Sequence, residues 1–125
     1  MMKSKIGDNM HQFCLPHVSI SDSDGEGCQI EFTETPSSED AYVLLQSHFE
    51  PPADGSLYVE SHHVAICGHF RIEEVELRRN ELCFILGDDA DETVQISFEA
   101  GETQYRRLKK VLSMMVPARR LSIQQ

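Results

Sequence analysis

The stretch EEVELRRNELCFIL, residues 73–86, decides the fold class of this chain. Val75 and Leu77 alternate with glutamates, which is the two-residue period of a half-buried strand. A turn is predicted at Arg79 and Asn80, and the apolar run that follows returns as a second strand. The pattern therefore predicts a β-hairpin with its glutamates on the side opposite the apolar residues.

Further alternating runs on both sides of this hairpin predict more strands. The 125 residues suit one domain, 1–125, which is the usual size for a single compact core. We expect residues 1–12 to be loose and residues 13–99 to be mainly β, in a meander of about six or seven mainly antiparallel strands. A run of strands followed by one helix is typical of the α+β class.

A change of period marks the C-terminal helix, which is predicted over residues 101–116. Pro117 ends it. We expect this amphipathic helix to pack on one face of the sheet. Its apolar stripe has the i, i+3, i+7 spacing of a helix and consists of Tyr105, Leu108, Leu112 and Met115.

Two predicted strands, AYVLL (residues 41–45) and LCFIL (residues 82–86), are apolar on both faces. One helix covers only one face of a sheet. The sheet must therefore curl onto itself, or a second copy of the chain must cover the other face in a homodimer.

Charge is distributed unevenly along the chain. Residues 1–104 contain all 21 acidic residues and only five of the 11 basic ones, a net charge of −16, whereas residues 105–125 contain six basic residues. A region with this net charge repels nucleic acids and anionic membranes and attracts basic proteins. The basic residues of the predicted C-terminal helix are open to three interpretations. They form the solvated side of the helix, they contact the acidic margin of the sheet, or they dock a second subunit.

Cysteine usage and the N-terminus indicate the compartment. Cys14, Cys28, Cys67 and Cys83 form no CxxC pair, and the first residues contain no apolar leader segment. No run approaches the ~18 apolar residues of a membrane span. We expect a cytoplasmic protein with reduced thiols that does not enter a membrane.

His62, His63, Cys67 and His69 are the residues most like metal ligands. On an extended strand His63, Cys67 and His69 point to one side but span ~20 Å, too far for one ion. Only a sharp bend at Gly68 would gather them. We therefore predict that the protein binds no metal and no cofactor. We interpret the histidines and the cysteine of this segment as half-buried residues of a strand.

No sequence motif of a nucleophile, a phosphate-binding loop or a zinc protease occurs, so we predict a protein without enzymatic activity. The cysteines are expected to be free and buried. The acidic residues are the better candidates for function, because a net charge of −16 exceeds the ~2–8 that solubility usually needs. The predicted partner-binding residues are Glu73, Glu74, Glu76, Asp88, Asp89, Asp91 and Glu92.

Four segments together resemble the bacterial immunity protein 10 family, over about residues 41–116. They are AYVLLQ (41–46), GSLYVE (55–60), IEEVELRRNELCFIL (72–86) and TVQISFEAGETQYRRLKKVL (93–112). Residues 61–70 differ from the Gly-rich stretch of that family and keep mainly Gly68. The resemblance implies an antidote that binds and blocks a cognate toxin domain of a polymorphic toxin system.

The resemblance and the charge favour one hypothesis: a cytoplasmic immunity protein that inhibits a basic toxin by binding it. The alternative is a small acidic secretion chaperone or adaptor that holds a segment of an effector protein. A third hypothesis is an enzyme that uses the histidines and cysteines of residues 62–69.

Overall fold

The computed structural model describes residues 10–23, 27–35, 41–47, 56–62, 67–87 and 92–124, which form nine strands, one α-helix and one short 3-10 helix. The strands are β1 (Met10–Cys14), β2 (His17–Ser23), β3 (Gly27–Thr33), β4 (Tyr42–Ser47), β5 (Ser56–Ser61), β6 (Cys67–Arg78), β7 (Glu81–Leu86), β8 (Glu92–Ser97) and β9 (Leu121–Ile123). Helix α2 spans Glu102–Met115, and the 3-10 helix η1 spans Ala118–Arg120.

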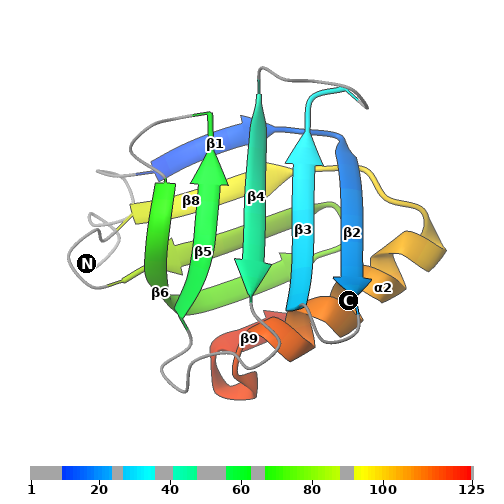
Figure 1. Ribbon diagram of the computed structural model, residues 1–125. Helices are drawn as coiled ribbons and strands as arrows, with labels where there is room; N and C mark the ends of the chain where they lie inside the picture. Colours follow the sequence, from blue (N-terminus) through cyan, green and yellow to red (C-terminus); the bar gives the residue numbers. More distant parts are fainter. Residues whose placement is uncertain are drawn as a thin grey trace.

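The strands form one mixed sheet in the order β1-β8-β7-β6-β5-β4-β3-β2, with β9 beside β6 (Figure 1). Most neighbours are antiparallel, but the pairs β1–β8 and β6–β9 are parallel. A mainly β chain with one C-terminal α-helix agrees with the predicted α+β class. The expected six or seven strands in an antiparallel meander are wrong, because β1 and β9 join the sheet from distant parts of the chain.

The N-terminal region also differs from its prediction. Residues 10–12, expected to be loose, belong to β1, which runs parallel to β8 from the pair Met10–Thr93 to the pair Cys14–Ser97. The segment MHQFC shows little apolar alternation, so its strand depends on hydrogen bonds to β8 rather than on its own pattern. Residues 1–9 lie outside the described part of the chain.

Strand β6 belongs to both halves of the sheet. Its first residues pair with β5, and the residues from Ile72 onward pair with β7, with a register shift between Ile72 and Glu74. A register shift of this kind is a β-bulge, which bends a strand and increases its twist. The front layer consists of β2 to β5 and the start of β6, and the back layer, which crosses behind it, contains β1, β8, β7 and the end of β6 (Figure 1).

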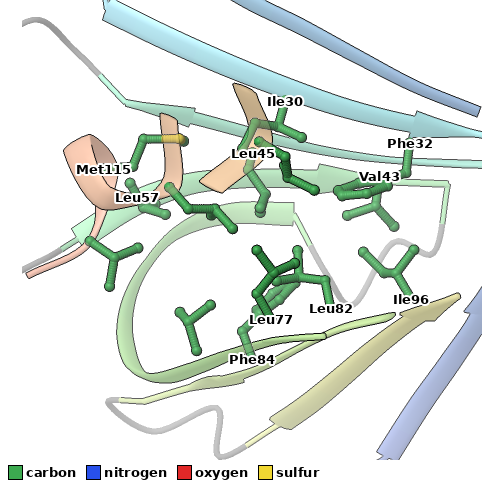
Figure 2. Close-up of a cluster of buried hydrophobic side chains, with 14 of the residues drawn as sticks. Ile30, Phe32, Val43, Leu45, Leu57, Leu77, Leu82, Phe84, Ile96 and Met115 are labelled. Carbon is green, nitrogen blue, oxygen red and sulfur yellow. The ribbon is translucent and has the colours of Figure 1, made fainter. Parts of the chain in front are cut away.

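The hydrophobic core lies between these two layers (Figure 2). Each strand contributes alternate residues, as the two-residue period of a strand requires. Ile30, Phe32 and Val43 of the front layer are fully buried, as are Leu77 and Ile96 of the back layer. The sheet therefore covers its own inner face within one chain.

The curled sheet explains how the strands that are apolar on both faces are covered. In β7 the inward residues are buried, whereas Cys83 and Ile85 point outward and are half-buried. In β4 the outward residue Leu44 is likewise half-buried. Since the sheet curls onto itself, the core does not need a second chain, and the homodimer stays a prediction.

Helix α2 closes the core beside β2, β3 and β9. Its observed bounds differ by one residue at each end from the predicted 101–116. The predicted apolar stripe is buried, together with Val111. Val116 is extended, with ψ of 135°, because a residue before proline avoids the helical conformation. No helix in the described ranges is long and apolar enough to cross a membrane.

The basic residues of the helix have mixed environments. Arg106 pairs with Glu102 at 3.3 Å, as the i, i+4 spacing predicts. Lys109 lies over the ring of Tyr105, with its Nζ atom 5.3 Å from the centroid. Arg107 and Lys110 are exposed. Most of this face is therefore the solvated side of an amphipathic helix.

The burial of α2 predicts which of its residues stabilise the fold. Leu112→Ala should lower the free energy of unfolding by about 2–5 kcal/mol, because it leaves a cavity in the core. Met114→Ala is a matched control, since Leu112 is 1% exposed and Met114 is 52% exposed. Urea unfolding followed by circular dichroism measures both, and equal losses would contradict the packing of α2 on the sheet.

Candidate functional site

The hairpin β6–β7 forms as predicted, with its turn at Arg79 and Asn80. Val75 and Leu77 point into the core, and Glu74 and Glu76 point outward. The register shift after Ile72 breaks the alternation, so Glu73 and Glu74 are both exposed although they are adjacent. The bulge thus adds one more carboxylate to the outer side of the hairpin.

The strand register places a fourth acid on this surface. Glu81 pairs with Arg78 across the hairpin, Cys83 pairs with Glu76, and Ile85 pairs with Glu74. Directly paired residues of antiparallel strands point to the same side of the sheet. Glu81 was missing from the predicted binding residues, although a two-residue turn at Arg79 and Asn80 already implies its pairing with Arg78.

We call this surface the hairpin face. It consists of the outward residues Glu73, Glu74, Glu76, Arg78, Glu81, Cys83 and Ile85.

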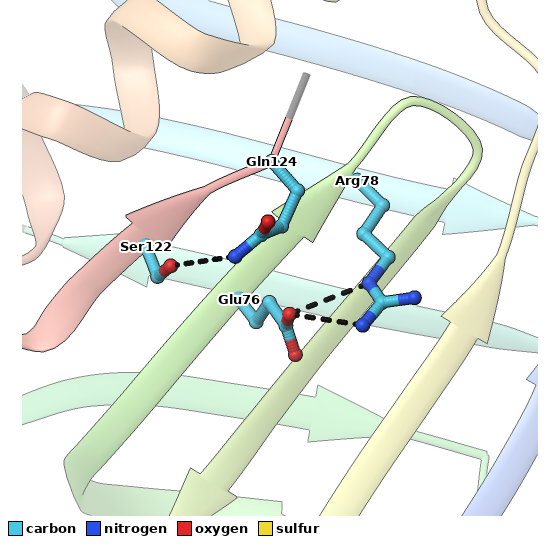
Figure 3. Close-up of polar contacts among 4 residues, drawn as sticks. All are labelled: Glu76, Arg78, Ser122 and Gln124. Carbon is cyan, nitrogen blue, oxygen red and sulfur yellow. Dashed lines mark hydrogen bonds and ion pairs between the residues drawn. The ribbon is translucent and has the colours of Figure 1, made fainter.

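Two of its four carboxylates pair with basic side chains. The guanidinium of Arg78 donates to Oε2 of Glu76 at 3.1 and 3.3 Å (Figure 3). Nε of Arg71 lies 3.7 Å from a carboxylate oxygen of Glu73. No basic side chain in the described part of the chain forms an ion pair with Glu74 or Glu81. The hairpin face therefore carries a net negative charge, because two acids remain after these pairs.

Two neighbouring hollows lie on the hairpin face, each of a size that suits one side chain. The first has a volume of about 210 Å³ and is lined by Glu76, Arg78, Glu81, Cys83 and Gln95. The second has a volume of about 200 Å³ and is lined by Met10, Glu74, Glu76, Cys83, Ile85 and Thr93. The lining of the second hollow combines the apolar side chains of Met10 and Ile85 with the carboxylates of Glu74 and Glu76. This combination suits a lysine or arginine, whose methylene stem packs on apolar atoms while its charged end stays outside.

Cys83 lines both hollows, so the pKa of its thiol depends on the charges around them. Burial raises the pKa of its thiol above the ordinary value, and the nearby charges of Glu76, Glu81 and Glu74 raise it further. A thiol with a raised pKa stays protonated at neutral pH and is a poor nucleophile. The arrangement favours the binding of a cation over thiol chemistry.

The other predicted acids are not part of the described hairpin face. Glu92 begins β8 and contacts the ring of His11 in β1, so it links these two strands. Asp88, Asp89 and Asp91 lie outside the described residues. The prediction therefore grouped acids from two places, and the strand register separates Glu92 from Glu74 and Glu76.

The histidine and cysteine segment forms the end of β5 and the start of β6. Gly68 has a φ of 140°, yet Cys67 and His69 both stay in strand β6 and are exposed. The prediction of buried cysteines is wrong for Cys14 and Cys67, which are exposed. The thiol of Cys67 donates to the carbonyl oxygen of Ser61 at 3.3 Å. His63 lies outside the described residues. Within the described ranges, no group of three or more His, Cys, Asp or Glu side chains is placed to hold a metal ion.

An unpredicted cluster lies on the outer side of the front layer. Glu60 of β5 accepts hydrogen bonds from the hydroxyl groups of Tyr42 and Tyr58, each at 2.7 Å. These bonds lower the pKa of the Glu60 carboxyl. The hydrogen bond to Glu60, then burial, raises the pKa of Tyr42 to about 12, and the bond to Glu60 also raises the pKa of Tyr58. We call these three residues the tyrosine–glutamate site. Tyr58 and Glu60 are two residues apart on one strand, a spacing that places them on one face.

Comparisons of the chain with models of protein families, with curated proteins and with solved structures find no match.

The negative charge of the hairpin face predicts a slow reaction of the Cys83 thiol. At neutral pH Cys83 should react with iodoacetamide more slowly than Cys14, which is exposed. Replacing Glu74, Glu76 and Glu81 by glutamine should accelerate Cys83, because removing negative charge lowers the pKa of the thiol. Mass spectrometry of timed samples measures both rates. An unchanged rate for Cys83 would contradict a negative potential at the hairpin face.

The tyrosine–glutamate site predicts how Tyr42 titrates. Its pKa is about 12 instead of the ordinary 10.0, so the folded state holds more protons than the unfolded state between these values. Stability should therefore fall as the pH rises through this interval. Glu60→Gln should move the tyrosine pKa back towards the ordinary value, as measured by the ultraviolet absorbance of tyrosinate. Glu31→Gln is the control, because Glu31 lies on the same outer face, across from Leu44. An equal effect of both substitutions would refute the assigned hydrogen bonds.

Proposed function

We propose that this chain is a non-enzymatic immunity protein, which binds a basic toxin domain through its hairpin face and blocks the toxin's activity. The observation that carries the proposal is the arrangement of three outward carboxylates of β6 and β7, those of Glu74, Glu76 and Glu81, around two hollows of side-chain size. Lysine and arginine side chains of the toxin would occupy these hollows. Covering the toxin's active surface inhibits it, so no catalytic residue is needed.

The charge of the whole chain supports a basic partner. A net charge of −16 over residues 1–104 attracts a basic protein over a long range and raises the rate of encounter. Glu74 and Glu81, which form no ion pair within the described part of the chain, then provide close contacts. Since Arg78 already pairs with Glu76, a toxin side chain would either join this pair or displace Arg78 from it.

The resemblance to the bacterial immunity protein 10 family supports the same proposal. It includes the hairpin itself, residues 72–86, and the strand and helix that follow it. Cytoplasmic localisation is part of the proposal, because an antidote of this kind protects the cell that produces the toxin.

Charge reversal of the hairpin face tests the proposal. The partner is the C-terminal domain of the protein encoded by the reading frame next to this one, produced together with the chain in cells. The triple variant Glu74→Lys, Glu76→Lys and Glu81→Lys should weaken binding by at least about 100-fold, since removing one close interfacial charge pair costs 2 kcal/mol or more. It should also abolish protection of the cells. Isothermal titration calorimetry and growth assays measure the two effects.

The control changes the net charge by the same amount at other places. It combines Glu34→Lys, Glu99→Lys and Glu102→Lys, three exposed glutamates outside the hairpin face. If both triple variants bind the toxin domain equally well, the hairpin face is not the interface. If the chain instead binds an unfolded segment of the partner as a dimer, the secretion chaperone is the better hypothesis.

A further inference from the structure

The tyrosine–glutamate site lies on the opposite side of the molecule from the hairpin face. Tyr42 belongs to β4 and Glu60 and Tyr58 belong to β5, which lie in the front layer (Figure 1). The hairpin face is the outer side of the back layer, and the core separates the two surfaces. A ligand at one of them therefore does not contact the other.

The geometry of the site leaves acceptors and aromatic faces for a ligand. Each oxygen of the Glu60 carboxylate accepts one tyrosine hydroxyl, Oε1 from Tyr58 and Oε2 from Tyr42. Both hydroxyl protons are used in these bonds, whereas a carboxylate oxygen has a second lone pair. The site therefore offers acceptors only, next to two tyrosine rings. A cation that donates hydrogen bonds complements such a site, whereas an anion does not.

Among the described residues, no lysine or arginine forms an ion pair with Glu60. Its partners on the neighbouring strands are Leu44 and Cys67. Arg71 lies on the same face, opposite Ser56, and pairs with Glu73. The sequence contains no lysine or arginine between Lys5 and Arg71, so the loops that connect strands β2 to β6 provide none either.

A histidine ring lies beside each of the two tyrosine rings. The ring of His69 packs against Tyr58 with centroids 5.2 Å apart, and the ring of His62 lies 6.3 Å from that of Tyr42. These contacts hold the tyrosine rings in place beside Glu60. A rigid pair of tyrosines costs little conformational entropy on binding, which is one reason why tyrosine is common at interface centres.

We propose that Glu60, flanked by Tyr42 and Tyr58, is a binding site for an exposed arginine side chain of a partner protein. A guanidinium is planar, donates two parallel hydrogen bonds to a carboxylate and stacks on an aromatic ring. It fits the two free lone pairs of Glu60 and the neighbouring rings at once. A lysine ammonium makes the ionic contact but lacks the planar fork, so the site should prefer arginine. The proposal does not rest on the toxin-binding function of the hairpin face.

Short capped peptides provide the test. A glycine–arginine–glycine peptide, the corresponding lysine peptide and a citrulline peptide are titrated into the full chain at mildly alkaline pH. Citrulline has the shape of arginine without its charge. The arginine peptide should shift the ring resonances of Tyr42 and Tyr58 in NMR spectra and saturate at millimolar concentration. The lysine peptide should bind more weakly, and the citrulline peptide should not bind.

Two variants and one control complete the test. Glu60→Gln should weaken the arginine peptide by at least about 10-fold, the effect of losing a charged hydrogen-bond partner. Tyr58→Leu should weaken it by about 2- to 5-fold, the range of an exposed cation–π contact. Glu31→Gln, on the same outer face, should change nothing. Circular dichroism confirms that each variant is folded.

The proposal is overturned if the arginine peptide produces no saturable shift, if citrulline binds as well as arginine, or if Glu31→Gln weakens binding as much as Glu60→Gln. These outcomes are independent of charge reversal at the hairpin face. A chain that loses toxin binding after that reversal but still binds the arginine peptide has two separate interaction surfaces.

Discussion

The structure depends on one strand, β6, that belongs to both layers of the sheet. Its first part pairs with β5 and its last part pairs with β7 and β9, and the bulge after Ile72 lies between the two. A twisted sheet that bends at one strand can place one of its faces inside, where apolar side chains leave water. With that bend, the described strands enclose a core that helix α2 alone could not cover.

The same bend produces two outer surfaces with different chemistry. The back layer presents the carboxylates of β6 and β7 around two hollows, and the front layer presents a carboxylate held by two tyrosines. Arg107 and Lys110 of α2 are exposed to solvent.

Much of the fold was predictable where the apolar pattern is strong. The hairpin at Arg79 and Asn80 and the helix up to Pro117 follow from two-residue and helical periods and from a turn and a proline. The strands β1 and β9 were not predictable, because their short segments gain strand structure only from the hydrogen bonds of β8 and β6. The residues of the two candidate sites were likewise predictable only where a local pattern determines their position. Glu74 and Glu76 were expected to point outward from alternation, but Glu81 required the register and Tyr42 required the pairing of β4 with β5.

By itself the sequence determined the α+β class, the inward positions of the strands and the large negative charge of the first 104 residues. These properties depend on residue types at short spacing. Only the tertiary structure decided which acids share a surface, because Glu92 contacts His11 on β1 while Glu81 lies opposite Arg78. It also decided that Glu60 meets two tyrosines, one of them 18 residues away along the chain. Side chains from separate strands become neighbours only when the pairing of those strands sets their register.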